Sequence, residues 1–578
     1  MFAADAEILA LEAVLTQPWG ADVLAATVAL AWHLRQRDSA RALRLVDGVV
    51  PLLASPSEGG PRRDPQRARA ALAACEASAL LCDFDVAERW LVDARQQLDP
   101  QADPCIEGDA WLAEAALAKM RVQRARELGA HENAIACYEA IAAPDRLAIA
   151  QIWLSFERAY AHPDIDHALG LQAPGDDWPE AQIAWKALWN ATRALALSYR
   201  NPAEAALLHR QAAAHAREVG LVRLEIVAMI NAGAATQGLG DMDLAAECFE
   251  IAAARAHATG WPTLIGTANT RVGELMRTLG ALEESRSILG EAIVALSIGA
   301  PGTHLAIAYA ALAETLCAMG RADESLAPMR QAIALYREVG FRHSLAVKLT
   351  FQARGLVAAG LPEQALAVCS EASALIEESG LHSLRVGVAE VLAELHHRFE
   401  LPAPPGMTLP TAALHHAEAA LVEGRRIEGW KAPARLYTFL AERWAEAGDH
   451  ARAYEYARQA LQANEKEAIQ KMNYPLALVR LRRRGSASDA AGTPPPGAPE
   501  PATERTRRQA SRTLTPKERS ILLLLARDYS NKEIAKSIAV SDETVKWHLK
   551  NLFSKLDADS RKHAVTRARS LGFISFSA

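Results

Sequence analysis

Aromatic residues are scarce in this 578-residue chain: they make up 6% of it, although 50% of the residues are hydrophobic. Alanine and leucine must therefore supply much of the apolar content, which favours helix packed on helix. The charged fraction of 23% is that of a folded protein with an ample core rather than of a disordered one. At about 150 residues per domain, the length predicts three or four domains, or one long repeat array with additions. We expect an all-α protein.

Segments that would insert into or cross a membrane are also lacking. The longest stretch without Asp, Glu, Lys or Arg, residues 292–313, has Gly299, Pro301 and Gly302 in its middle and predicts a helix, a turn and a second helix. Acidic residues, among them Asp5, Glu7 and Glu12, precede the first basic residue, Arg35, which is the wrong sign for a signal peptide. Seven cysteines without a C-x-x-C pair indicate reduced thiols. These features predict a cytoplasmic protein with no membrane partner.

Signatures of catalysis and of cofactor binding are missing as well. No Gly-Lys dipeptide occurs, so no G-x-x-x-x-G-K-[ST] loop can hold a triphosphate. The motif H-E-x-x-H is absent, and the adjacent histidines of the pairs at 396–397 and 415–416 point about 100° apart on a helix, so neither pair can chelate a metal. The first 480 residues show only helical periodicity, which excludes the alternating strands of a phosphorylated receiver. We expect no enzyme, no catalytic residue, no metal and no cofactor.

Glycines, in contrast, recur at a fixed interval. The main set, spaced by 40 residues, is Gly240, Gly280, Gly320 and Gly360, and a half-period set is Gly220, Gly260, Gly340 and Gly380. Arg200 stands one period upstream of the main set, and twelve residues after each of these five turn positions stands an alanine: Ala212, Ala252, Ala292, Ala332 and Ala372. Each unit is therefore predicted to be two antiparallel helices joined at glycine, with small residues where the helices touch. The pattern resembles tetratricopeptide-like repeats in a longer form.

Further hairpins with looser spacing are expected at both ends of this array. They are predicted in residues 21–54 around Asp38, 66–98 around Asp83, 109–142 around Gly129 and 436–466 around Gly448. Together they make residues 1–481 a solenoid in which each unit buries its apolar stripe only against its neighbours. A small effector, peptide or protein could lie in the groove, where polar residues recur on the first helices of the units: Asn231, Arg271, Glu274, Arg277, Glu314 and Arg354. A solvated helix face is the simpler explanation of these residues.

A Pro- and Arg-rich segment, residues 482–513, has almost no residue able to build a core and is predicted to be a disordered linker. The charge changes sign beyond it. Residues 505–578 contain 16 basic and 7 acidic residues, a net charge of +9, and because the whole chain carries −6, residues 1–504 carry −15. A basic tail thus follows an acidic body.

Residues 514–578 predict four short helices. Capping boxes mark three helix starts, at Thr515–Glu518, Ser530–Glu533 and, less well, Ser541–Thr544. Only residues 539–541 separate the second and third helices, which is the tight joint of a helix-turn-helix. On the third helix an apolar stripe is expected to face the core: Val545, Leu549, Leu552, Phe553 and Leu556.

The outward side of this third helix carries groups that can read DNA. Lys546, Trp547 and Lys550 are predicted to reach base edges in the major groove of double-stranded DNA. Residues suited to phosphate oxygens flank them: Asn531, Lys532, Thr544, Asn551 and Lys555.

The elements L-T-P-x-E, N-K-E-I-A and T-V-K-x-H within residues 514–574 resemble the LuxR-type DNA-binding domain. The resemblance implies a four-helix domain that binds DNA as a homodimer, with Lys546, Trp547 and Lys550 at the base-contacting positions. The chain departs from the family at Trp547, where many members carry a smaller residue.

We therefore expect a sequence-specific transcriptional regulator whose repeat body senses a ligand or partner, with the acidic body competing with DNA for the basic tail. The alternative is a helical-repeat scaffold for protein interactions whose small C-terminal domain serves assembly.

Overall fold

The computed structural model describes most of residues 2–481 and parts of the segment from 521 onward. The described residues are 2–17, 20–53, 64–101, 103–161, 183–198, 201–427, 430–471, 477–478, 480–481, 521–522, 524–526, 529–537, 545–546, 549, 552–553, 558, 561 and 564–565. The chain forms two compact units, Met1–Ser486 and Ala487–Ala578. We call the first the repeat body. The predicted linker, 482–513, lies outside the described residues.

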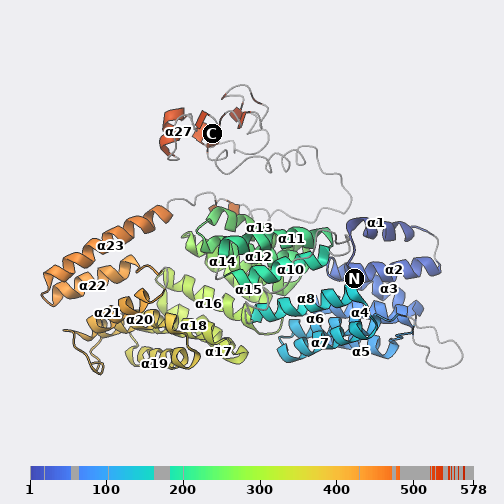
Figure 1. Cartoon of the computed structure of the whole chain (residues 1–578), viewed down its shortest axis with the longest axis horizontal. Helices are drawn as coiled ribbons and strands as arrows, with labels where there is room; N and C mark the ends of the chain where they lie inside the picture. Colours follow the sequence, from blue (N-terminus) through green and yellow to red (C-terminus); the bar gives the residue numbers. More distant parts are fainter. Residues whose placement is uncertain are drawn as a thin grey trace. The chain divides into compact units, whose positions relative to one another are not determined.

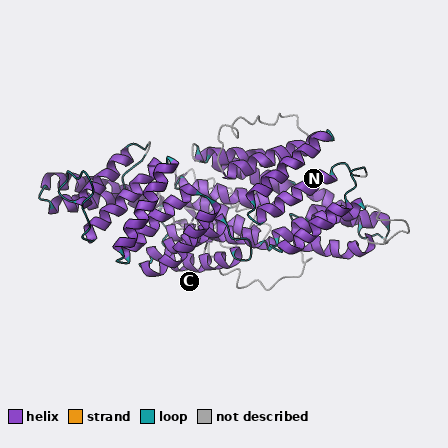
Figure 2. Cartoon of the chain, turned by 90° about the horizontal axis from the view of Figure 1, so that it is seen from below, coloured by secondary structure: helices purple, strands orange, loops and turns teal. Residues whose placement is uncertain are grey.

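Helices account for the regular structure of the described residues, which contain no strand (Figures 1 and 2). The repeat body is an array of antiparallel helical hairpins, which confirms the predicted all-α, tetratricopeptide-like architecture. None of the described helices combines the length and apolarity needed to cross a bilayer.

The repeat body divides into two arms and a terminal part. After α1 (Asp5–Val14), the first arm contains α2 (Ala21–Leu34), α3 (Ser39–Leu53), α4 (Pro65–Leu80), α5 (Phe84–Gln97), α6 (Ile106–Met120), α7 (Arg124–Ala140) and α8 (Pro144–Ala161). The second arm contains α10 (Ile183–Leu197), α11 (Pro202–Glu218), α12 (Val222–Gly238), α13 (Met242–Thr259), α14 (Pro262–Thr278), α15 (Leu282–Leu296), α16 (Thr303–Ala318), α17 (Ala322–Val339), α18 (Arg342–Ala358), α19 (Pro362–Ser379), the 3₁₀ turn η2 (His382–Leu384) and α20 (Arg385–Arg398). The terminal part comprises α21 (Ala412–Arg425), α22 (Ala434–Glu446) and α23 (His450–Lys471).

The periodic glycines end helices, as their spacing predicts. Every glycine of the main and half-period sets has a positive φ, for example 83° at Gly240 and 78° at Gly320. At both positions the N–H of the following residue donates to a carbonyl five residues back, as in Asp241 N to Thr236 O at 3.0 Å. This is the Schellman helix end, whose left-handed residue is most easily glycine.

The turn predicted at Gly129 is wrong. Gly129 lies inside α7, and the hairpin instead turns at Val122, which has a φ of 60°. The Schellman bond is nevertheless the same: Gln123 N donates to Ala118 O at 2.8 Å. A valine in this conformation gives no sequence signal, because β-branched residues rarely adopt it.

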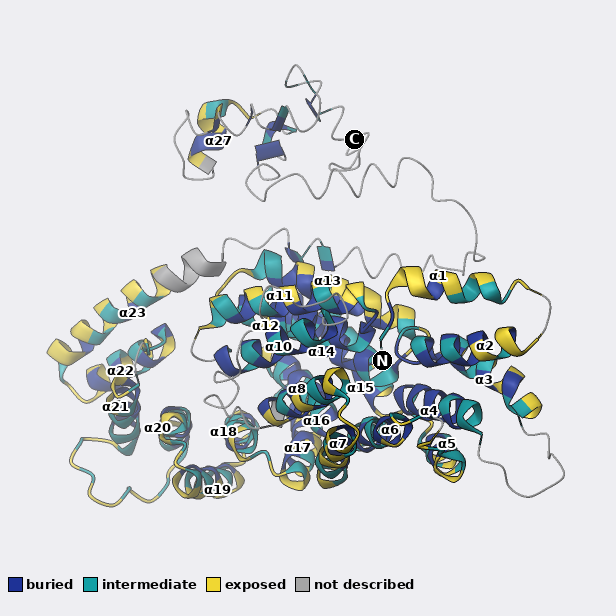
Figure 3. Cartoon of the chain, turned by 45° about the vertical axis from the view of Figure 1, so that its right-hand side comes forward, coloured by how far each residue is buried: buried dark blue, intermediate teal, exposed yellow. Residues whose placement is uncertain are grey.

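Small residues stand at the closest helix contacts of the second arm. A Cβ built on Gly233 would lie 2.5 Å from Phe249 Cε1, and one on Gly273 would lie 2.6 Å from Leu289 Cγ. The alanines expected at the contact position twelve residues after each main turn are all buried. Buried positions gather between the helices of the arms, whereas α1 and α23 carry many exposed ones (Figure 3).

The expectation that each unit packs only against its sequence neighbours is also wrong. The hairpin turns of the first arm contact the second arm: Trp261 Nε1 donates to Ser39 Oγ at 2.9 Å, and Cys82 Sγ lies 3.6 Å from Thr263 Oγ1. Val122 packs on Gly302, at which a Cβ would lie 2.9 Å from Val122 Cγ2. Trp261 is completely buried at this junction. The repeat body therefore closes partly on itself, and it encloses a cavity where the arms meet.

Candidate functional site

In the C-terminal unit, helix α27 (Asn531–Ser537) begins at the predicted capping box. Ser530 N donates to Glu533 Oε2 at 2.7 Å, and Glu533 N donates to Ser530 Oγ at 3.4 Å. The hydrogen bonds from Ser530 lower the pKa of the Glu533 carboxyl. The box satisfies two backbone N–H groups at the helix start and so fixes where α27 begins.

A small apolar core holds this unit together. Its buried members come from residues well separated in sequence: Ile521, Leu522, Leu525, Ile534, Ala535, Val545, Leu549, Leu552 and Ala564. Three of the five predicted stripe residues are among them, Phe553 is half-buried, and Leu556 lies outside the described residues. Lys546, which follows the buried Val545, is exposed. The segment thus turns an apolar side inward while a lysine faces out.

The residues predicted to contact the DNA backbone have different environments. Lys532 is exposed on the first turn of α27. Asn531 is half-buried, and its Oδ1 accepts a hydrogen bond from Arg561 Nη1 at 2.6 Å, while Arg561 Nη2 also donates to Tyr529 O. Arg561 thus stabilises the start of α27 through hydrogen bonds, and the sequence did not predict this role. Five predicted residues lie outside the described residues: Trp547, Lys550, Thr544, Asn551 and Lys555.

Comparison with known families identifies this unit. Residues 512–568 match the family described as bacterial regulatory proteins, luxR family. The carboxyl-terminal part of the chain is therefore a LuxR-type helix-turn-helix domain, joined to a tetratricopeptide-like repeat body.

Curated relatives match the same stretch. The HTH-type transcriptional regulator AlkS of Alcanivorax borkumensis is 42% identical over 62 residues, which are 11% of this chain and 7% of that protein. The response regulator protein VraR of Staphylococcus aureus is 47% identical over 55 residues, 10% of this chain and 26% of that protein. The chain thus spans about a quarter or less of the length of the curated relatives it matches.

Solved helical structures are similar to longer parts of the chain at low identity. Aspartyl phosphate phosphatase F from Bacillus subtilis matches with a TM-score of 0.37 and 9% identity, covering 71% of this chain and 96% of that one. The human IFIT1 dimer with m7Gppp-AAAA matches with a TM-score of 0.36 and 14% identity, covering 80% and 95%.

In the repeat body, five of the six predicted groove residues are held in ion pairs with other residues of the body. Arg277 Nη2 lies 2.9 Å from Glu314 Oε2, and Lys348 Nζ lies 2.5 Å from the other oxygen of the same carboxylate. Arg354 reaches Glu390 at 3.2 Å. Glu274 Oε2 accepts from Arg271 Nη1 at 2.7 Å. The pairs of Arg277, Lys348 and Arg354 link the first helices of successive units, α14, α16, α18 and α20.

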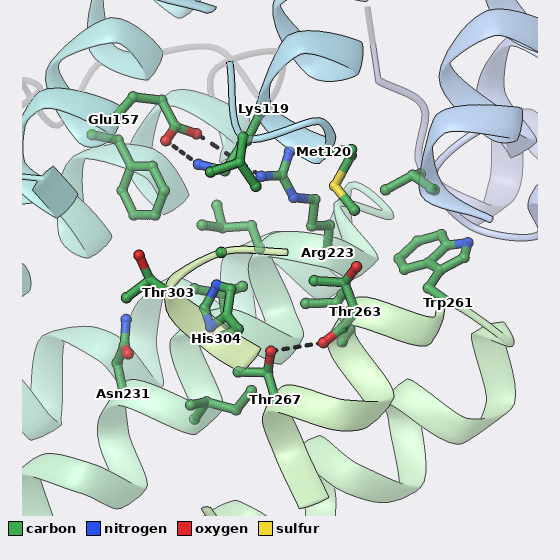
Figure 4. Close-up of a pocket in the computed structure, with 18 of the residues that line it drawn as sticks. Lys119, Met120, Glu157, Arg223, Asn231, Trp261, Thr263, Thr267, Thr303 and His304 are labelled. Carbon is green, nitrogen blue, oxygen red and sulfur yellow. Dashed lines mark hydrogen bonds and ion pairs between the residues drawn. The ribbon is translucent and has the colours of Figure 1, made fainter. Parts of the chain in front are cut away.

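Two of the six predicted residues, Asn231 and Arg271, line the cavity between the arms. This cavity has a volume of about 130 Å³, and its walls come from α6 and α8 of the first arm and from α10, α12, α14 and the start of α16 in the second (Figure 4). Most of its surface is apolar, with Trp153 and Trp261 among the lining residues.

Charged groups gather on one side of the cavity, where Lys119, Glu157 and Arg223 lie together (Figure 4). Lys119 Nζ donates to Glu157 Oε2, and Arg223 Nη2 lies 4.0 Å from Glu157 Oε1. The neighbouring cations lower the pKa of the buried Glu157 to about 2, against the effect of its burial. None of these three residues was predicted, because they come from helices far apart in sequence and only the packing of the arms brings them together.

His304 stands at the start of α16 on the same cavity. Burial lowers the pKa of its imidazole to about 4, and the nearby cations Arg271, Lys119 and Arg223 add to the effect. The ring is therefore neutral at neutral pH. Within the described residues, no cluster of three His, Cys, Asp or Glu side chains is arranged to hold a metal ion.

Proposed function

We propose that this protein is a sequence-specific, DNA-binding transcriptional regulator whose repeat body senses a ligand. The observation that carries the proposal is the LuxR-family match over residues 512–568, on a unit whose described core buries Val545 while Lys546 faces out. A helix held by its apolar side and basic on the other is what the major groove accepts.

Charge supports the same assignment. The net charge of +9 over residues 505–578 favours a polyanion, and exposed lysines of the described part include Lys532, Lys536 and Lys546. In this proposal Lys546, Trp547 and Lys550 contact base edges. Asn531, Lys532, Thr544, Asn551 and Lys555 hold the phosphates, with Asn531 positioned by Arg561. A pair of such domains binds a two-fold site as a homodimer.

The net charge of −15 on residues 1–504 supports a simple means of control. We propose that it competes with DNA for the basic domain, and that a ligand in the body relieves this competition. Both interactions weaken with salt, since the Debye length is about 8 Å at physiological ionic strength.

Selection of genomic fragments by the full chain tests the DNA assignment. We expect enrichment of one two-fold motif, and we expect the double substitution Lys546→Ala and Lys550→Ala to abolish the preference, since each good base contact contributes about 1–3 kcal/mol. The control Lys431→Ala removes an exposed lysine of the body and leaves the preference unchanged. Wild-type protein that enriches no motif overturns the proposal and favours the scaffold.

A further inference from the structure

The cavity between the arms is lined by charged and by apolar groups. The basic residues Lys119, Arg223 and Arg271 line it together with the neutral His304, and its apolar lining includes Leu188, Leu221, Val227 and Leu264. A pocket of this kind orients a ligand that is polar at one end and apolar at the other.

The charges around these basic residues do not balance. Behind the lining residues, Arg124 pairs with Glu127 at 2.9 Å, and Arg271 pairs with Glu274 at 2.7 Å. With Lys119 bound to Glu157, the group contains four cations and three carboxylates, which leaves one positive charge in excess. A single negative charge on a ligand would neutralise it. A buried dianion would bring a charge that no group of the cavity compensates.

Unpaired polar groups also line the cavity: the acceptors Glu157 Oε1 and Gln36 Oε1 are buried without a hydrogen bond, and two donors lack one as well. The Arg223 side chain is 14% exposed, yet its guanidinium makes no hydrogen bond to the described residues and only the 4.0 Å ion pair with Glu157. The Asn231 Nδ2 group is buried without an acceptor. A buried donor without an acceptor costs free energy, so an acceptor supplied by a ligand would stabilise both groups. A carboxylate matches the geometry of a guanidinium.

The start of α16 adds to this preference. Gly302 is the N-cap residue, and no side chain caps the first turn of the helix. Thr303 and His304 therefore present a positive helix end to the cavity beside Arg223 and Asn231 (Figure 4).

We propose that the cavity between the arms is a binding site for a small organic monoanion, a carboxylate with an apolar chain or ring. The carboxylate lies against Arg223, Asn231 and the start of α16, and the apolar part lies along Trp153 and the leucines. At about 10–15 Å³ for each water-sized probe, a volume of about 130 Å³ holds a ligand of about ten non-hydrogen atoms. The inference rests on the proposed function, because it names the ligand class that the sensing body takes.

Such a ligand also has a mechanical consequence. Lys119 and Glu157 belong to the first arm, and Arg223, Asn231 and His304 belong to the second. A molecule bound between them stabilises the contact of the two arms, and the ligand therefore changes the repeat body where its two halves meet.

Thermal unfolding and calorimetry of the full chain with octanoate and with phenylacetate test the site. Saturation at about 100 times the Kd raises the Tm by about 2–3 °C for a body of this size. The matched alcohols, octanol and 2-phenylethanol, bind about 10–100-fold more weakly, because they lack the charge that Arg223 receives. Inorganic phosphate, which has no apolar part, gives no shift.

Two substitutions locate the binding. Arg223→Gln weakens octanoate about 10–100-fold, whereas Arg277→Gln, which removes an arginine paired with Glu314 away from the cavity, leaves the Kd unchanged. Val227→Phe fills apolar space in the cavity and blocks binding. This second variant tests the site even if the Arg223→Gln variant fails to fold. Equal affinity for alcohols and carboxylates, binding that survives both cavity variants, or no binding of either carboxylate overturns the inference.

DNA selection with the same preparations separates the two proposals. If the chain selects a DNA motif but binds no carboxylate, the proposed ligand class is wrong and the proposed regulator function stands. If the chain binds carboxylates but selects no motif, the proposed regulator function is wrong and the binding site stands.

Discussion

The two arms of the repeat body build the same turns from different residues. In the second arm the left-handed residue that ends a helix is glycine, as at Gly240, Gly280 and Gly320. In the first arm it is Cys82 or Val122, with φ of 65° and 60°, and these two residues are also 40 positions apart. Both arms therefore follow one period, which is visible in the sequence only where glycine marks it.

The difference has a structural counterpart. Cys82 and Val122 have side chains that a glycine lacks, and these side chains contact Thr263 and Gly302 of the second arm. At Cys82 and Val122, the turn thus combines the strain of a left-handed non-glycine residue, about 1–2 kcal/mol, with a contact between the arms. A turn in a repeat protein can serve packing as well as chain reversal.

The largest expected effect comes from breaking the contact between the arms. Trp261→Ala removes a completely buried indole and its hydrogen bond to Ser39, and we expect a loss of about 3–5 kcal/mol in the free energy of unfolding. Urea denaturation followed by far-ultraviolet circular dichroism measures it. Trp261→Phe keeps most of the packing and loses less. A loss below about 1 kcal/mol for the alanine variant would mean that the arms do not pack together.

A smaller effect follows from buried histidines. Burial lowers the pKa of His209 to about 3, so the unfolded chain, with a histidine pKa near 6.5, binds the proton more readily. Its contribution to stability is complete above about pH 6.5 and falls as the pH decreases. Between about pH 7 and pH 5, we expect His209→Leu to reduce the loss of stability by about 2 kcal/mol.

The measurement is denaturation at both pH values, and identical pH dependence in wild type and His209→Leu would contradict the assignment of a neutral buried ring.

The smallest effects test the turns themselves. Ala142 has a φ of 50° and is exposed, so Ala142→Gly relieves strain without loss of packing and stabilises the first arm by up to about 1 kcal/mol. Gly360 has a φ of 74° and open space around its Cα, and Gly360→Ala destabilises the second arm by about 1 kcal/mol. Thermal unfolding measures the change in stability of both variants, and we expect opposite signs. Changes of the same sign would show that the turns of the two arms are not equivalent.

Local patterns explain what the sequence could predict. The glycine period predicted the helix ends of the second arm because a left-handed residue is a local requirement, and the capping box predicted the start of α27 for the same reason. The turn at Val122 could not be predicted, because β-branched residues rarely adopt the left-handed conformation of a helix end and so do not mark it in the sequence. The cavity itself was not predicted: two of the six predicted groove residues, Asn231 and Arg271, line it, whereas Lys119 and Glu157 reach it only through the contact of the arms.

The measurement that tests the central claim most directly is the affinity of the full chain for a selected two-fold DNA fragment and for a scrambled fragment at several salt concentrations. We predict a clear preference for the selected fragment at every salt concentration, and nearly equal, weak affinities for both in the Lys546→Ala, Lys550→Ala variant. Equal affinity of the wild-type chain for the two fragments, or an undiminished preference in the variant, would contradict the account.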